Sequence, residues 1–102
     1  MITLLEGEKR DVVVSLTRIR GSGTWSLTSP QYRILDYKRA VITGYNWVTA
    51  AWDATESELS ALFDSTLTGL TTVGIYYVQL RGTIGTERYG AEVRVQLLDW
   101  GP

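Results

Sequence analysis

Alternation of hydrophobic and polar residues runs along most of the chain and predicts β-strands. In the segment 11–19, Val12, Val14 and Leu16 alternate with a partly polar set, as in a strand with one face on the core. Further β-rich segments follow at 24–29, 31–37, 39–43 and 45–53. The glycines in RGSG at 20–23 predict a turn between the first two of these strands. Pro30 cannot donate a ladder hydrogen bond, so it marks a strand end, an edge or a bulge.

The clearest strands lie near the end of the chain. Segments 73–84 and 87–98 both alternate strongly, and the glycine-containing loop between them predicts a β-hairpin. In the first, the set that begins with Gly74 and Tyr76 shares one face, and the set that contains Tyr77 and Arg81 shares the other. In the second, Glu92, Arg94 and Gln96 share the face opposite to the valines. The set that contains Tyr77 and the set that contains Glu92 therefore form an amphipathic outer surface.

One segment favours a helix. Thr55 followed by Glu58 matches a capping box, and Leu59, Leu62 and Phe63 then fall at helical spacing. We therefore expect one short helical segment near residues 55–64, about two turns long, covering one end or edge of a sheet. Many short strands with this single insertion predict one all-β domain over residues 1–102, a two-sheet β-sandwich. A small closed barrel is the alternative.

The stretch GIYYV at 74–78 resembles the tyrosine corner of immunoglobulin-like domains. In that corner a tyrosine just past a turn bonds a backbone group upstream through its hydroxyl. The resemblance implies a structural corner built by Gly74 and Tyr76, with Val78 where an antibody domain has its second cysteine. Tyr77 points the other way and is a candidate for an interaction surface.

Composition excludes several kinds of chemistry. The chain of 102 residues has neither cysteine nor histidine, so thiolate chemistry, disulfides and soft-metal sites are absent. Ten basic residues balance eleven acidic ones without a basic block, which disfavours nucleic acid as a partner. No apolar run reaches the length of a membrane span, and charge at Glu6 disfavours a signal peptide. We expect no metal, no cofactor, no membrane partner and synthesis in the cytoplasm.

Catalytic and sugar-binding sites have weaker signals. Asp53, Glu56 and Glu58 beside Trp52 form the densest carboxylate group, but acidic residues in a first helical turn are common for structural reasons. The chain is therefore expected not to be an enzyme. Aromatic side chains on a sheet could stack sugars, and Trp25, Tyr45 or Trp47 are the candidates for such a glycan platform. The alternative is that most of these rings fill the core.

The order of segments from about residue 45 to 98 resembles small immunoglobulin-like proteins of tailed phages and prophages. A tryptophan-bearing strand, the TESELSAL segment, the GIY stretch and a hairpin ending in alternating valines carry this resemblance, which extends to the N-terminal module of phage baseplate upper proteins. It implies an immunoglobulin-like fold and a structural or adaptor role in a tail, baseplate or head, and so a place in the virion. We expect assembly with particle subunits or a homo-oligomer through Tyr77 and Arg94, with Trp100 contributing from the tail. A carbohydrate- or cell-surface-binding module is the alternative.

Overall fold

The computed structural model describes residues 1–16 and 27–101, and all of its regular structure in these ranges is β-strand. The turn expected at 20–23 and the position of Trp25 lie outside the described residues. The strands are β1 (Ile2–Leu5), β2 (Lys9–Ser15), β3 (Thr28–Leu35), β4 (Val48–Thr49), β5 (Ala51–Asp53), β6 (Glu58–Asp64), β7 (Gly74–Ile84) and β8 (Glu87–Leu98).

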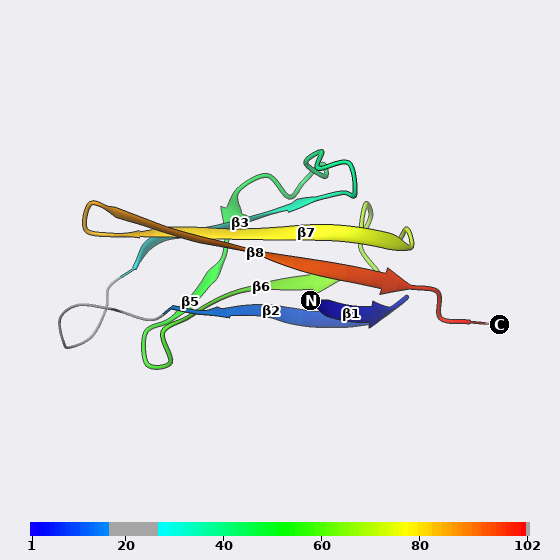
Figure 1. The fold of residues 1–102 in the computed structure, drawn as a ribbon, viewed down its shortest axis with the longest axis horizontal. Helices are drawn as coiled ribbons and strands as arrows, with labels where there is room; N and C mark the ends of the chain where they lie inside the picture. The colour runs from blue at the N-terminus through cyan, green and yellow to red at the C-terminus, as the bar shows by residue number, and fades with distance from the viewer. Residues whose placement is uncertain (17–26, 102) are drawn as a thin grey trace.

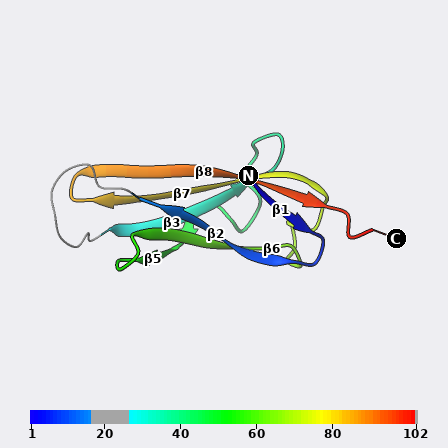
Figure 2. The same ribbon diagram turned by 60° about the horizontal axis from the view of Figure 1, so that its bottom comes forward.

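The strands form two sheets, as the sequence predicts, and not a closed barrel (Figures 1 and 2). One sheet has five strands in the order β1-β8-β7-β3-β4, and the other has three in the order β2-β6-β5. All neighbouring strands are antiparallel except β1 and β8, which run parallel. The molecule is elongated, 52 × 22 × 18 Å, and the β7–β8 hairpin follows its long axis (Figure 1).

The core lies between the two sheets and is built by the alternating residues that the sequence indicates. Tyr76, Val78 and Leu80 of β7 are buried, and so are Val95 and Leu97 of β8. From the other sheet come Val12 of β2 and Leu59, Ala61 and Phe63 of β6. The side chains of the intervening residues on β7 and β8 therefore lie on the outer face of the five-stranded sheet.

The hairpin and the bulge follow the predicted local chemistry. Ile84 pairs with Glu87, so only Gly85 and Thr86 connect β7 to β8. Gly85 has φ 63°, the conformation that glycine supplies at the first central position of a two-residue turn. The pairing of β3 with β7 shifts register between Thr28 and Gln31, which places Pro30 at a bulge.

The prediction of a helix near residues 55–64 is wrong, because Glu58–Asp64 forms strand β6. Burial along β6 alternates with period two, so Phe63 is fully buried while Leu62 is 46% exposed. The backbone N–H groups of Thr55 and Glu56 donate to Oδ1 of Asp53 at 3.0 and 3.2 Å. The segment that was expected to begin a helix is therefore the turn of the β5–β6 hairpin. Pairing with β2 on one side and β5 on the other satisfies the backbone of β6 better than two isolated helical turns would.

The segment 45–53 forms two strands in different sheets. β4 pairs with β3, and β5 pairs with β6. Between them Ala50 is buried, and its N–H donates to the carbonyl oxygen of Pro30 at 2.9 Å. The apolar run 39–43 makes only an isolated bridge, between Leu35 and Val41.

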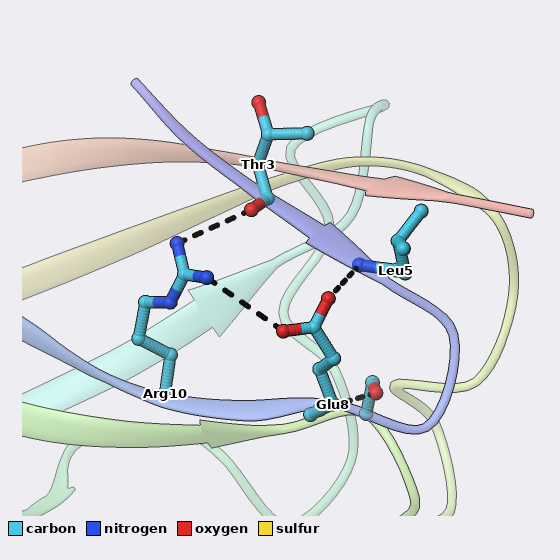
Figure 3. A network of polar contacts seen from close by, with 5 residues as sticks. Thr3, Leu5, Glu8 and Arg10 are labelled. Carbon is cyan, nitrogen blue, oxygen red and sulfur yellow. Dashed lines mark hydrogen bonds and ion pairs between the residues drawn. The ribbon is translucent and has the colours of Figure 1, made fainter. Parts of the chain in front are cut away.

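A polar network fixes the crossing from β1 to β2, which carries the chain from one sheet to the other (Figure 3). The Glu8 carboxylate accepts a hydrogen bond from the Leu5 N–H at 2.8 Å and lies 3.7 Å from a guanidinium nitrogen of Arg10. Arg10 in turn donates to the carbonyl oxygen of Thr3 at 3.3 Å. Buried Ser65 donates its N–H and its hydroxyl to the carbonyl oxygen of Glu8. The crossing is thus tied to both sheets.

Candidate functional site

Polar and aromatic side chains from three strands and one loop meet on the outer face of the five-stranded sheet. The register places Gln31 opposite Arg81, Arg33 opposite Gln79, Gln79 opposite Glu92, and Tyr77 opposite Arg94. Arg39 and Trp47 reach the same surface from the loop between β3 and β4. We call this group the outer-face cluster; its members are Gln31, Arg33, Arg39, Trp47, Tyr77, Gln79, Arg81, Glu92 and Arg94.

Trp47 is stacked by two guanidinium groups. The Cζ atom of Arg81 lies 3.6 Å from the ring centroid, and that of Arg33 lies 4.6 Å from it. Arg81 is held in place by two hydrogen bonds to Oε1 of Gln31, at 3.1 and 2.9 Å. Trp47 has φ 50°, an uncommon backbone conformation for an aromatic residue, so the surrounding contacts hold it against local strain.

Glu92 joins the strands of the cluster. It accepts a hydrogen bond from Gln79 at 2.8 Å and forms an ion pair with Arg39. Gln79 in turn accepts from Nε of Arg33 at 2.6 Å. Hydrogen bonds from Arg39 first and Gln79 second stabilise the charged carboxylate, and together they lower the pKa of Glu92 below its ordinary value.

Tyr77 completes the cluster beside this ion pair. The Cζ atom of Arg39 lies 4.5 Å from the centroid of the Tyr77 ring, a cation–π contact. Arg94, the residue opposite Tyr77 on β8, is exposed. Within the described part of the chain, its side chain makes no hydrogen bond or ion pair.

The cluster is strongly basic although the whole chain is not. It contains four arginines and one carboxylate, whereas the chain has a formal net charge of −1. Arginine presents a planar fork of donors that fits carboxylates, and stacking on aromatic rings fixes its orientation before binding. The arrangement therefore suits recognition of acidic groups.

The expected structural corner lies on the other side of β7. The Tyr76 hydroxyl donates to the carbonyl oxygen of Thr72 at 2.5 Å, and its ring packs edge-on against Phe63 with centroids 5.2 Å apart. Gly74 has φ 148° and begins β7. Burial is the main cause that raises the pKa of Tyr76.

The expected interaction residues are only partly brought together. Tyr77 and Arg94 are neighbours, but Trp100 lies in the tail that follows β8. Trp100 is 68% exposed, and its backbone N–H donates to the Glu6 carboxylate at 3.2 Å. Of the described residues proposed for glycan stacking, Tyr45 packs against the core and Trp47 is already stacked by arginines.

Two of the three carboxylates considered for catalysis, Asp53 and Glu58, make hydrogen bonds within or between strands and turns. Asp53 caps the β5–β6 turn, and Glu58 accepts a hydrogen bond at 3.5 Å from the hydroxyl of Ser15 on the neighbouring strand. Among residues 1–16 and 27–101, no three acidic side chains are grouped as a metal site would require. The same ranges contain no helix with the length and hydrophobicity to cross a bilayer.

Sequence reasoning found the β7 and β8 side of the cluster but missed Arg33 and Arg39. Arg33 alternates with Tyr32 and Ile34, so the strand period alone could have assigned it to an outer face. Arg39 lies in a loop 53 residues from Glu92 in sequence, and no local pattern connects them.

No protein-family model matches the chain, and no curated protein matches it. Among solved structures, it is similar to a DUF4785 family protein from Legionella pneumophila subsp. pneumophila. The two share 15% sequence identity with a TM-score of 0.49 over 97% of this chain. The match covers 26% of that protein's chain, so this chain spans about a quarter of its length.

Proposed function

We propose that this chain is a non-enzymatic, immunoglobulin-like adaptor module that binds an acidic protein partner through the outer-face cluster. The strand order supports the immunoglobulin-like assignment. With β2, β6 and β5 as strands B, E and D, and with β3, β7, β8 and β4 as C, F, G and C′, the two sheets have the order of that fold. Tyr76 lies two residues before the core position Val78, and its hydroxyl donates to the carbonyl oxygen of Thr72. Both features agree with the same assignment.

The basic character of the cluster carries the proposal. The cluster contains four arginines and one carboxylate, and three of the four arginines are oriented by rings or amide oxygens. A preorganised basic face binds an acidic surface with less ordering cost than mobile side chains would. The sequence resemblance to phage sandwich proteins suggests the particle of a tailed phage or prophage as the setting, with another subunit as the partner. Portal, capsid or tail genes beside this gene would support that setting.

Glycan binding is the second candidate, because Trp47 lies on an exposed sheet face beside polar side chains. Two guanidinium groups already lie over its ring, so a sugar that stacks on a covered face must displace them, which makes this function less favourable. The two proposals differ in their dependence on charge. Acidic partners bind less tightly as salt rises, whereas stacking on neutral sugars responds little.

The test uses poly-L-glutamate as a carboxylate probe and a panel of neutral oligosaccharides, titrated against the immobilised protein. Salt-sensitive binding of poly-L-glutamate is expected, and Tyr77→Ser with Arg94→Glu should weaken it about tenfold or more. Lys9→Glu is the matched control, since it makes a charge reversal on β2 of the other sheet. Equal loss in the control, or binding of neutral oligosaccharides alone, would contradict the proposal.

A further inference from the structure

Much of β8 is an open sheet edge. β7 pairs with β8 along its whole length, from Glu87 to Leu97, but β1 pairs only with residues 95–98 (Figure 1). Within the described chain, no strand covers the other edge of β8 between Glu87 and Arg94. An unpaired strand edge is a template for another strand.

The backbone groups at this edge can be assigned. The Leu98 carbonyl oxygen accepts a hydrogen bond from the Glu6 N–H, on the β1 side of β8. Successive residues of a strand alternate in the side to which both backbone groups point. The N–H and C=O groups of Arg88, Gly90 and Glu92 therefore point to the open edge, and all three residues are exposed. The parallel pairing of Ile2 with Val95 occupies the carbonyl oxygen of Arg94, so the open part of the edge ends there.

The charges along this edge are self-complementary. When two copies of β8 pair antiparallel about Gly90, Arg88 of each copy lies opposite Glu92 of the other, and the two glycines lie opposite each other. Centring the pair on Ala91 would instead bring Arg88 opposite Arg94, and centring it on Glu92 would bring the two glutamates together. Opposite charges across strands stabilise a pair and like charges destabilise it, so the register about Gly90 is favoured.

This register also fits the ends of the open edge. Arg94 would lie opposite Thr86 of the second copy, which is in the hairpin turn, so the second strand ends there. β1 begins to pair at the next residue, because Ile2 lies opposite Val95. The second copy therefore fills the open edge up to β1.

From this fit we infer that the protein forms a two-fold homodimer by antiparallel pairing of β8 about Gly90. The three pairs 88–92, 90–90 and 92–88 each exchange two backbone hydrogen bonds and join the five-stranded sheets into one. The contact is small, so the dimer is expected to be weak and concentration-dependent. The dimer contact runs along the edge of β8, whereas an acidic partner binds the outer face of the sheet; Glu92 belongs to both surfaces.

Sedimentation over a concentration series, from micromolar to about millimolar, measures the dimer. Arg88→Glu should weaken it about tenfold or more, because both cross-strand pairs become repulsive. Glu92→Arg should do the same, while an equimolar mixture of the two variants should dimerise like the wild type. Arg94→Glu is the control on the same edge: it should leave the dimer unchanged while weakening binding of poly-L-glutamate.

Amide hydrogen exchange tests the same register without any variant. In the wild-type protein, rising concentration should increase the protection of the backbone N–H groups of Arg88, Gly90 and Glu92 from exchange. The protection of Tyr89 and Ala91 should not change, since their N–H groups already point to β7. A strict monomer at millimolar concentration would overturn the inference. A tighter dimer of the Arg94→Glu variant would overturn it too, because residue 94 lies opposite Arg88 only in the register centred on Ala91.

Discussion

The hydroxyl of Tyr76 donates a hydrogen bond to the carbonyl oxygen of Thr72, 2.5 Å away and four residues upstream. The bond joins the start of β7 to the loop before it, and the Tyr76 ring packs on Phe63 in the core. Tyr76→Phe keeps the ring but leaves the carbonyl without its partner. We expect it to lower the free energy of unfolding by about 1 kcal/mol, measured by urea denaturation.

Tyr77→Phe is the matched control. The Tyr77 ring lies on the outer face under Arg39, and phenylalanine preserves that contact. The free energy of unfolding should therefore change by less than about 0.5 kcal/mol. If the two substitutions had reversed effects, the assignment of these residues to the two faces of β7 would be wrong.

Residues Leu62 and Phe63 distinguish the strand from a helix at β6. Phe63→Ala should cost about 3–5 kcal/mol, because it leaves a cavity at a fully buried position. Leu62→Ser should be tolerated, since that side chain is largely exposed on the opposite face. A helix would bury both residues on one stripe. Comparable large losses in thermal or urea unfolding would therefore contradict the strand.

The ion pair of Glu92 with Arg39 predicts a pH dependence of stability. The folded pKa of Glu92 lies below its ordinary value of 4.5, so the unfolded chain binds the proton more tightly. The contribution is present above the ordinary pKa and is lost as the pH falls through the folded pKa. The stability difference between wild type and Glu92→Gln should therefore shrink from neutral to acid pH. Asp64 and Asp99 also have lowered pKa values, and both remain in the variant as an internal control.

Chelation should not affect stability. The chain has no cysteine or histidine, and the described residues hold no group of three acidic side chains suited to a metal. The melting temperature in excess EDTA should equal that in buffer. A fall of several degrees would reveal a bound hard cation.

Structure that depends on neighbouring residues could be predicted from the sequence, and structure that depends on residues distant in sequence could not. Alternation in β7 and β8 predicted the core residues Tyr76, Val78 and Val95, because strand period and burial agree there. It failed at Thr55 and Glu58, where a local capping pattern was outweighed by pairing with strands distant in sequence. The split of 45–53 at Ala50 likewise depends on which sheet each half meets. Arg39 could be joined to Glu92 only once the loop between β3 and β4 was placed on the sheet.

NMR chemical-shift mapping during a titration with poly-L-glutamate at low salt locates the surface of the protein that binds carboxylates. The shifts should concentrate on the outward residues of β3, β7 and β8 and on the indole N–H of Trp47, and added salt should reverse them. Shifts centred on β2 and β6, or no shifts at all, would contradict a docking function for the outer-face cluster.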